Sequence, residues 1–365
     1  VLTSPSSCLK RDMTCTVSMR IYIFNPEHDM SLASGLVNFT PPRAGRLLRH
    51  DLSFLPAVWA KQDAAVLVDE VDYAWEQYKS TGLSKQCNFI DCNDLSRMAS
   101  VDMGLEFEPW GWDLPVREQL VKCNVSTSSL PDNDYLNTIK RMSHRGWSAT
   151  NLLPELTKTR NTIGEAKICH NWEELKRFLS TYHRIVVKSP WSCSGRGVRY
   201  IEDNMPKQLE GWFNNVIKQQ GCVLMEPYYN KVIDFGMEFV CDRKGDIEYR
   251  GLSLFETSNG AYIGNMVAEE KAKEEIMARY IPLSMLHEIR LSIISTLTPM
   301  LANTYHGPFG IDMMIVNSDG KVLVHPCVEL NLRMTMGHVS LGITEHPCHL
   351  MNIVYQQGKY CLQLT

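Results

Sequence analysis

A lysine followed at once by a loop of small residues is the feature of this sequence best suited to chemistry. Lys188 ends a short β-branched run, and residues 189–197 contain three serines and two glycines. We expect a buried strand to end at Lys188 and to hold its positive charge in a cleft. Because Gly195 and Gly197 tolerate positive φ, backbone N–H groups of this loop can approach an anion closely. The segment therefore predicts a binding site for a polyphosphate.

A second polar group lies on two expected strands that a tight turn joins near the end of the chain. Asp312 is on the first strand, and Glu329 and Asn331, two residues apart, share a face of the second. Three oxygen donors on one face suit Mg²⁺, which binds carboxylates together with phosphate oxygens and water. Arg333 continues that face and can reach a transferring phosphoryl group. Apolar residues alternate with this set, so a half-exposed sheet is an equally good interpretation of this motif alone.

Composition bounds the class of protein and its partners. A chain of 365 residues exceeds one hydrophobic core, so two or three domains are expected. The net charge of −4 and the lack of a basic run argue against nucleic acid, and no apolar stretch is long enough to suggest a membrane partner. The twelve cysteines are scattered without a CxxC pair, which predicts reduced, mostly buried thiols in a cytoplasmic protein.

Strands and helices alternate from Met19 onward, which predicts an α/β protein with a parallel sheet in its N-terminal part. Residues 1–18 are polar and we expect them to be disordered. In the N-terminal part we expect strands at 21–24, 64–68 and 88–90, and helices at 51–60, 75–79 and 117–123. Farther along we expect helices at 147–156, 172–179, 208–218 and 282–302, and strands at 166–169, 222–225, 235–241 and 247–255.

Three motifs occur in a fixed order: the lysine with its glycine loop, Glu226 directly after a strand, and the D…E-x-N-x-R set that ends at Arg333. This order resembles the ATP-grasp superfamily of carboxylate–amine and carboxylate–thiol ligases, over about residues 145–340. The resemblance implies an ATP-grasp fold, α/β with an α+β C-terminal part. It also implies a pre-ATP-grasp domain at 19–140, a small subdomain with the glycine loop at 141–221, and a large subdomain with the magnesium site at 222–365.

The resemblance implies roles for single residues. Lys188 matches a lysine that contacts the α- and β-phosphates, and Arg333 matches a catalytic arginine near the γ-phosphate. An earlier phosphate-binding lysine of the family has no lysine here, and Arg145 is the substitute. The implied nucleotide-binding set is Arg145, Lys188, Ser194, Gly195, Arg196, Gly197, Glu226, Pro227, Tyr228, Tyr229 and Asp234, and the implied metal ligands are Asp312, Glu329 and Asn331.

The resemblance also implies the reaction. A ligase of this type uses ATP to phosphorylate a small carboxylate, and an amine or another nucleophile then attacks the acyl phosphate. Its cofactors would be ATP and two Mg²⁺ ions, with Mn²⁺ as an alternative metal, and a homodimer is left open. A kinase that phosphorylates a hydroxyl shares every nucleotide motif, and a non-catalytic nucleotide-binding protein is a further alternative.

Residues 25–29 follow the first expected strand and would face the cleft between domains. They supply most of the candidate substrate residues, which are Asn25, Glu27, His28, Asp29 and, on a later strand, Arg250. A capped turn explains the same residues equally well, because Asn-Pro starts turns and Asp29 could cap a helix that begins near Ser31.

Overall fold

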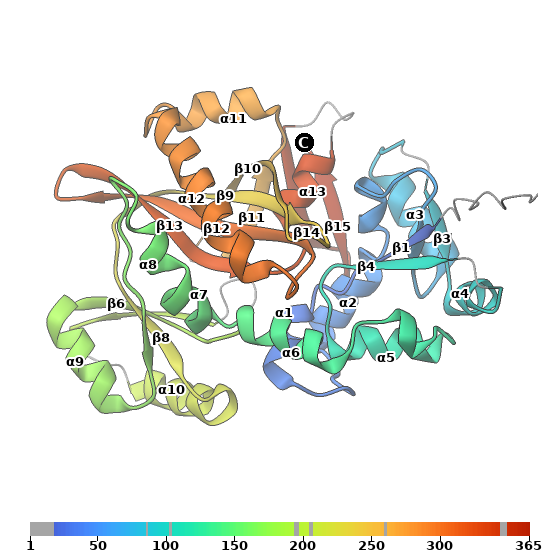
Figure 1. The fold of residues 1–365 in the computed structure, drawn as a ribbon, viewed down its shortest axis with the longest axis horizontal. Helices are drawn as coiled ribbons and strands as arrows, with labels where there is room; N and C mark the ends of the chain where they lie inside the picture. Colours follow the sequence, from blue (N-terminus) through green and yellow to red (C-terminus); the bar gives the residue numbers. More distant parts are fainter. Residues whose placement is uncertain are drawn as a thin grey trace, which may run out of the picture.

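The computed structural model describes residues 18–84, 87–101, 104–192, 197–203, 207–258, 261–343 and 349–365. Within them the chain forms three β-sheets: a parallel sheet near the N-terminus, a small antiparallel sheet, and a large antiparallel sheet at the centre (Figure 1). The α/β class predicted from the sequence is confirmed.

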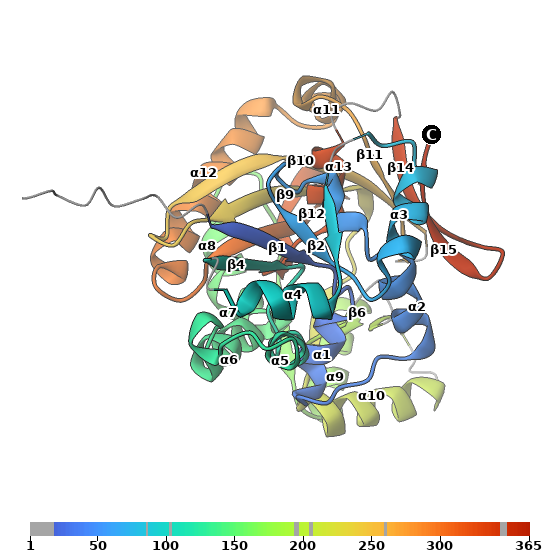
Figure 2. The ribbon, with the colours of Figure 1, turned by 90° about the vertical axis from the view of Figure 1, so that its right-hand side faces the viewer.

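The N-terminal sheet has the strand order β3-β2-β1-β4, and all of its pairs are parallel. Its strands are β1 (Met19–Ile23), β2 (Ala65–Leu67), β3 (Asn88–Ile90) and β4 (Leu105–Pro109). Its helices are α1 (His28–Ser34), α2 (Arg43–Asp51), α3 (Val71–Ser80), α4 (Cys92–Ala99) and α5 (Leu114–Lys122). Alternate residues of the strands pack on α3 on one face and on α4 and α5 on the other (Figure 2).

One prediction for this domain is wrong, and one strand has no counterpart among the predictions. The helix expected at 51–60 is absent, because α2 ends at Asp51 and only a single 3₁₀ turn, Leu55–Val58, follows. Strand β4 was not predicted, because Glu106 and Glu108 interrupt its apolar residues; both carboxylates lie within 3.6 Å of the guanidinium of Arg20 on β1.

The small sheet has the order β5-β8-β6-β7 and is antiparallel throughout. Its strands are β5 (Lys167–Cys169), β6 (Arg184–Lys188), β7 (Val198–Glu202) and β8 (Val223–Pro227), and its helices are α9 (Trp172–Tyr182) and α10 (Lys207–Gln220). Asn171 begins α9 by accepting the N–H groups of Glu173 and Glu174, so the fixed start of this helix follows from its N-cap.

The large sheet has the order β13-β12-β9-β10-β11-β14-β15. Its strands are β9 (Lys231–Cys241), β10 (Ile247–Ser258), β11 (Ala261–Met266), β12 (Gly307–Ser318), β13 (Lys321–Asn331), β14 (Leu350–Gln356) and β15 (Lys359–Leu364). Its helices are α11 (Glu270–Met277), α12 (Leu283–Leu301) and α13 (Met336–Gly342). The apolar stripe predicted for α12, which includes Ile289, Ile293 and Leu297, is buried in the core beside this sheet.

Helices α6 (Asn133–Met142), α7 (Arg145–Asn151) and α8 (Leu153–Leu156) connect the N-terminal part to the small sheet. The single helix predicted at 147–156 is two helices, because Pro154 lacks the N–H that would continue α7 and instead lies in the first turn of α8. Strand β8 belongs to the small sheet although it follows residue 221. The division into 19–140, 141–221 and 222–365 stays a prediction.

The cysteines differ in part from expectation. Cys92 and Cys123, 31 residues apart, form a disulfide between the start of α4 and the end of α5, which corrects the prediction that all thiols are reduced. A separation of 31 residues carries no signal in the sequence, and only the packing of α4 beside α5 brings the two sulfurs together. Five of the six described free cysteines are buried, as predicted. No described helix has both the length and the apolar character that crossing a bilayer requires.

Candidate active site

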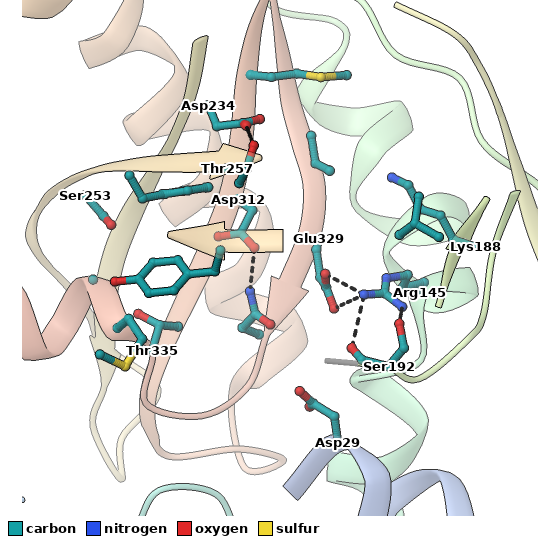
Figure 3. Close-up of a pocket in the computed structure, with 18 of the residues that line it drawn as sticks. Asp29, Arg145, Lys188, Ser192, Asp234, Ser253, Thr257, Asp312, Glu329 and Thr335 are labelled. Carbon is teal, nitrogen blue, oxygen red and sulfur yellow. Dashed lines mark hydrogen bonds and ion pairs between the residues drawn. The ribbon is translucent and has the colours of Figure 1, made fainter. Parts of the chain in front are cut away.

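A cavity of about 870 Å³ lies where the three sheets meet. Figure 3 shows side chains from the small sheet, the large sheet and the N-terminal helices converging on it. The residues predicted from the sequence that line it are Glu27, Asp29, Arg145, Lys188, Glu226, Pro227, Tyr228, Tyr229, Asp234, Asp312, Glu329, Asn331 and Arg333.

Lys188 is held in place by Glu226 on the neighbouring strand. Its Nζ donates to both carboxylate oxygens of Glu226 at 2.6 Å, and both side chains are 8% exposed. Strand pairing explains the contact: Glu226 lies opposite Val186, two residues before Lys188 on the same face of β6. The buried Lys188 ammonium is therefore held by Glu226 at the end of β6, where it lines the cavity.

Aromatic and polar side chains next to this pair form the same end of the cavity. The guanidinium of Arg184 lies 4.0 Å from the ring centre of Tyr228. The hydroxyl of Tyr229 accepts the N–H of Glu165 at 3.0 Å, and burial raises the pKa of this tyrosine. Asp234 accepts from the Thr257 hydroxyl at 2.7 Å. This end of the cavity therefore offers an aromatic surface at Tyr228 and a carboxylate, Asp234, whose position is fixed by a hydrogen bond.

Arg145, at the start of α7, links the small sheet to the large sheet. Its Nη2 donates to both oxygens of Glu329 at 2.7 Å, and its Nη1 donates to the carbonyl of Ser189 and the hydroxyl of Ser192, also at 2.7 Å (Figure 3). Burial alone would lower the pKa of Arg145, but the charge of Glu329 prevails and raises it. One guanidinium therefore holds a predicted metal ligand and the start of the glycine loop together.

The glycine loop is described only at its ends. Ser194, Gly195 and Arg196 lie outside the described residues. Gly197 is required for close approach of the chain, because a Cβ there would lie 2.3 Å from the Ser192 hydroxyl oxygen.

The predicted metal ligands come together on β12 and β13. Asp312 lies directly opposite Glu329, and Asn331 Nδ2 donates to Asp312 at 3.1 Å. The pairing is irregular between Asp312 and Met314, because Met314 pairs with His325 and three residues of β13 then lie opposite one residue of β12. Burial, and then the charges of Glu329 and Glu238, raise the pKa of Asp312 to about 7.

This donor set fits a hard cation, because its negative charge is only partly compensated and its oxygens lie on two paired strands. Among the described residues, no group of three or more His, Cys, Asp or Glu side chains is arranged to hold a metal. The predicted set contains two carboxylates and one amide, so any further ligand would have to come from the nucleotide or water.

Arg333 is held by a residue from the N-terminal domain. Its Nη2 donates to Asp29 at 2.8 Å and its Nε donates to the same carboxylate at 3.2 Å, although 304 residues separate the two. Burial would raise the pKa of Asp29, but the charge of Arg333 outweighs it and lowers that pKa. Met334 N–H also donates to the carbonyl of Trp110 at 2.8 Å, so two contacts fix this segment against the N-terminal sheet.

No family model matches the sequence, and no curated protein matches it. Solved structures do match the fold. Biotin carboxylase from Campylobacter jejuni aligns with a TM-score of 0.50 at 12% identity, covering 95% of this chain and 74% of that one. Pyruvate carboxylase from Rhizobium etli aligns with a TM-score of 0.52 at 11% identity, covering 89% of this chain and 27% of that one. The chain has the ATP-grasp fold.

Within this ATP-grasp fold, the residues after β1 divide into two groups. Asn25 and His28 are buried away from the cavity: Asn25 Nδ2 donates to the Gly111 carbonyl at 2.8 Å, and His28 Nδ1 lies 3.3 Å from Asp113. Glu27 and Asp29 line the cavity instead, and Glu27 pairs with Arg49 on α2. Asp29 does not cap a helix, because α1 already begins at His28.

Arg250 lies outside the cavity, on the exposed side of β10, where it pairs with Glu248 at 2.9 Å. The physical reason is an irregularity in strand pairing: Tyr249 pairs with Phe239 and Gly251 with Glu238, which leaves Arg250 as the extra residue. It does not join the other substrate candidates.

Sequence reasoning missed Glu238, a carboxylate on β9 that is 2% exposed and lines the cavity. Two glycines, Gly310 on β12 and Gly337 on α13, make room for the Glu238 carboxylate. A Cβ on Gly310 would lie 2.4 Å from one of its oxygens, and a Cβ on Gly337 would lie 1.9 Å from the other. His338 Nδ1 lies 2.9 Å from Glu238 Oε2, a close contact whose direction does not make a hydrogen bond. An acidic residue inside the apolar run 235–241 was the signal that could have found it.

Proposed function

We propose that the protein is an ATP- and Mg²⁺-dependent ligase. ATP would transfer its γ-phosphoryl group to a small carboxylate, and an amine or another nucleophile would attack the resulting acyl phosphate, releasing ADP and phosphate. The proposal is supported chiefly by one cavity, into which the small sheet, α7 and the large sheet bring Lys188, Arg145, Arg333 and the pair Asp312–Glu329. The biotin carboxylase with the same fold was solved as a complex with β,γ-ATP.

The base and ribose of the nucleotide would lie at the end formed by Tyr228, Tyr229 and Asp234. The phosphates would then point toward Lys188, whose pairing with Glu226 fixes the ammonium before the nucleotide arrives, so little reorganisation is needed on binding. Arg333, held by Asp29, lies beyond it and would stabilise charge on the transferring group.

Asp312, Glu329 and Asn331 would hold Mg²⁺, which neutralises phosphate charge and orients the triphosphate when bound. Arg145 now occupies both oxygens of Glu329. We infer that Arg145 leaves Glu329 and turns to the phosphates when Mg·ATP binds, because the metal would then balance the charge of Glu329 and the phosphates would offer the guanidinium a bidentate anionic partner. Two ions, Mn²⁺ as a substitute, a homodimer and a cytoplasmic location stay predictions.

The test is a screen for ADP release from Mg·ATP over small carboxylates and amino acids, each with and without candidate amines. Hydroxylamine is added in a parallel series to trap an acyl phosphate as the hydroxamate. The proposal expects carboxylate-dependent ADP release and hydroxamate. ADP release with a hydroxyl acceptor and no hydroxamate would identify a kinase, and ATP binding without any ADP release would identify a non-catalytic nucleotide-binding protein.

A further inference from the structure

We propose that the end of the cavity beside the N-terminal domain is a subsite for an apolar group of the substrate, either an aliphatic chain or an aromatic ring. The inference rests on the proposed function and deepens it, because it names the kind of side chain that the substrate carries. It concerns a part of the cavity that contains none of the predicted nucleotide or metal residues.

Half-buried apolar side chains from five separate elements form this part of the cavity, here called the apolar lobe. They are Met30 of α1, Leu48 of α2, Met336 of α13, and Ile353 and Tyr360 of β14 and β15. All five line the cavity, and Leu48, Met336, Ile353 and Tyr360 pack against one core cluster that also contains Trp110. Each of them therefore presents apolar surface to the cavity, where a ligand could cover it.

The walls of the apolar lobe are tied to one another. Tyr360 N–H at β15 donates to the Asp51 carboxylate at the end of α2, at 2.8 Å. Tyr73 of α3 donates to the same carboxylate at 2.9 Å. These contacts fix the C-terminal hairpin against α2, so the lobe has a defined shape before any substrate binds.

The apolar lobe is continuous with the reaction centre. Asp29, which holds Arg333, directly precedes Met30 in α1, and Met336 follows Arg333 by three residues. The small sheet with Lys188 lies on the left of Figure 1, whereas α1 and α2 lie to its right. A substrate whose reacting carboxylate is next to Arg333 can therefore extend into the lobe while ATP occupies the opposite end.

The charged residues next to the apolar lobe indicate that it excludes charged substrate groups. Glu27 lies 2.5 Å from Arg49, and Asp29 is paired with Arg333. A charged group placed in the lobe would lose its hydration and would have to compete with these existing pairs. An apolar group instead gains free energy from covering the five side chains, because apolar area leaves water on both surfaces.

The test measures the dissociation constants of butyrate, hexanoate and octanoate by ligand-observed NMR, with Mg²⁺ and ADP present. We expect the affinity to rise roughly fourfold with each methylene that enters the lobe. Equal affinities along the series, or no binding of any member, would overturn the inference.

Matched variants locate the effect. Leu48→Gln should reduce the gain per methylene to less than half, and Met336→Gln should do the same if Leu48→Gln fails to fold. Val37→Gln changes an apolar residue that is 44% exposed outside the cavity and should leave the series unchanged. If all three variants keep the full chain-length dependence, the binding lies elsewhere and the inference is wrong.

Failure of the apolar subsite can be distinguished from failure of the proposed ligase function. Binding of Mg·ATP, measured by titration calorimetry on the same samples, tests the nucleotide end alone. If Mg·ATP binds and the carboxylate series is flat, only the apolar subsite is wrong; if Mg·ATP does not bind, the ligase proposal itself fails.

Discussion

The two ends of the cavity are built in different ways. At the small-sheet end, Lys188 and Glu226 meet because their strands are neighbours in one sheet, and 38 residues separate them. At the N-terminal end, Asp29 and Arg333 meet although 304 residues separate them, and only the packing of one domain on another joins them. The first end is a local product of strand pairing, whereas the second depends on the assembly of the whole chain.

The largest expected effect tests the small-sheet end. Lys188→Ala leaves the Glu226 carboxylate buried without its partner, and the free energy of unfolding should fall by about 3–5 kcal/mol. Urea unfolding measures this. The matched control is Lys167→Ala, whose ion pair with Glu165 is largely exposed, and there the loss should stay below about 1 kcal/mol. Equal losses in the two variants would mean that the Lys188–Glu226 pair does not hold this end.

Glu329 lines the cavity between its two ends. Glu329→Gln removes a negative charge from the metal set, and ADP release from Mg·ATP should fall by about 10²–10³-fold. Glu248→Gln changes an exposed carboxylate on the solvent side of β10 and should leave turnover unchanged. Turnover retained in Glu329→Gln would remove this residue from the site.

At the N-terminal end, Asp29→Asn breaks the charge pair that orients Arg333. We expect kcat to fall roughly 10- to 100-fold because the guanidinium loses its fixed position, while the affinity for Mg·ATP stays the same. Steady-state kinetics and titration calorimetry separate the two quantities, and Asp63→Asn on an exposed loop is the control. If the affinity for Mg·ATP falls together with kcat, Asp29 acts on the nucleotide rather than through Arg333.

The last expected effect is spread over several pH units and concerns the metal-free protein. Because the folded-state pKa of Asp312 is raised from 3.8 to about 7, the folded protein binds a proton that the unfolded chain has lost. The contribution of this group to stability is therefore lost as pH rises from 3.8 through about 7, with a slope of at most about 1.4 kcal/mol per pH unit. Asp312→Asn should remove this slope in urea unfolding measured in a chelator, and an unchanged slope would assign it to other groups.

The same contrast explains what could be predicted from the sequence. Lys188 at a strand end and the placement of Asp312 and Glu329 on two paired strands both follow from short-range patterns, and the structure has both of them. The register that puts Asp312 directly opposite Glu329 depends on the pairing irregularity between Asp312 and Met314, which regular alternation does not predict. Strand β4 could not be recognised because Glu106 and Glu108 give this segment the polar composition that is typical of a loop. The Asp29–Arg333 pair could not be foreseen, because no local pattern relates residues 304 positions apart.

The decisive experiment is a structure of the protein with Mg²⁺ and a non-hydrolysable ATP analogue. We expect the triphosphate within hydrogen-bond distance of Lys188 Nζ, a metal ion on Asp312 and Glu329, and Arg145 released from Glu329. A nucleotide bound outside the cavity, or a metal ion that does not contact these two carboxylates, would contradict this expectation.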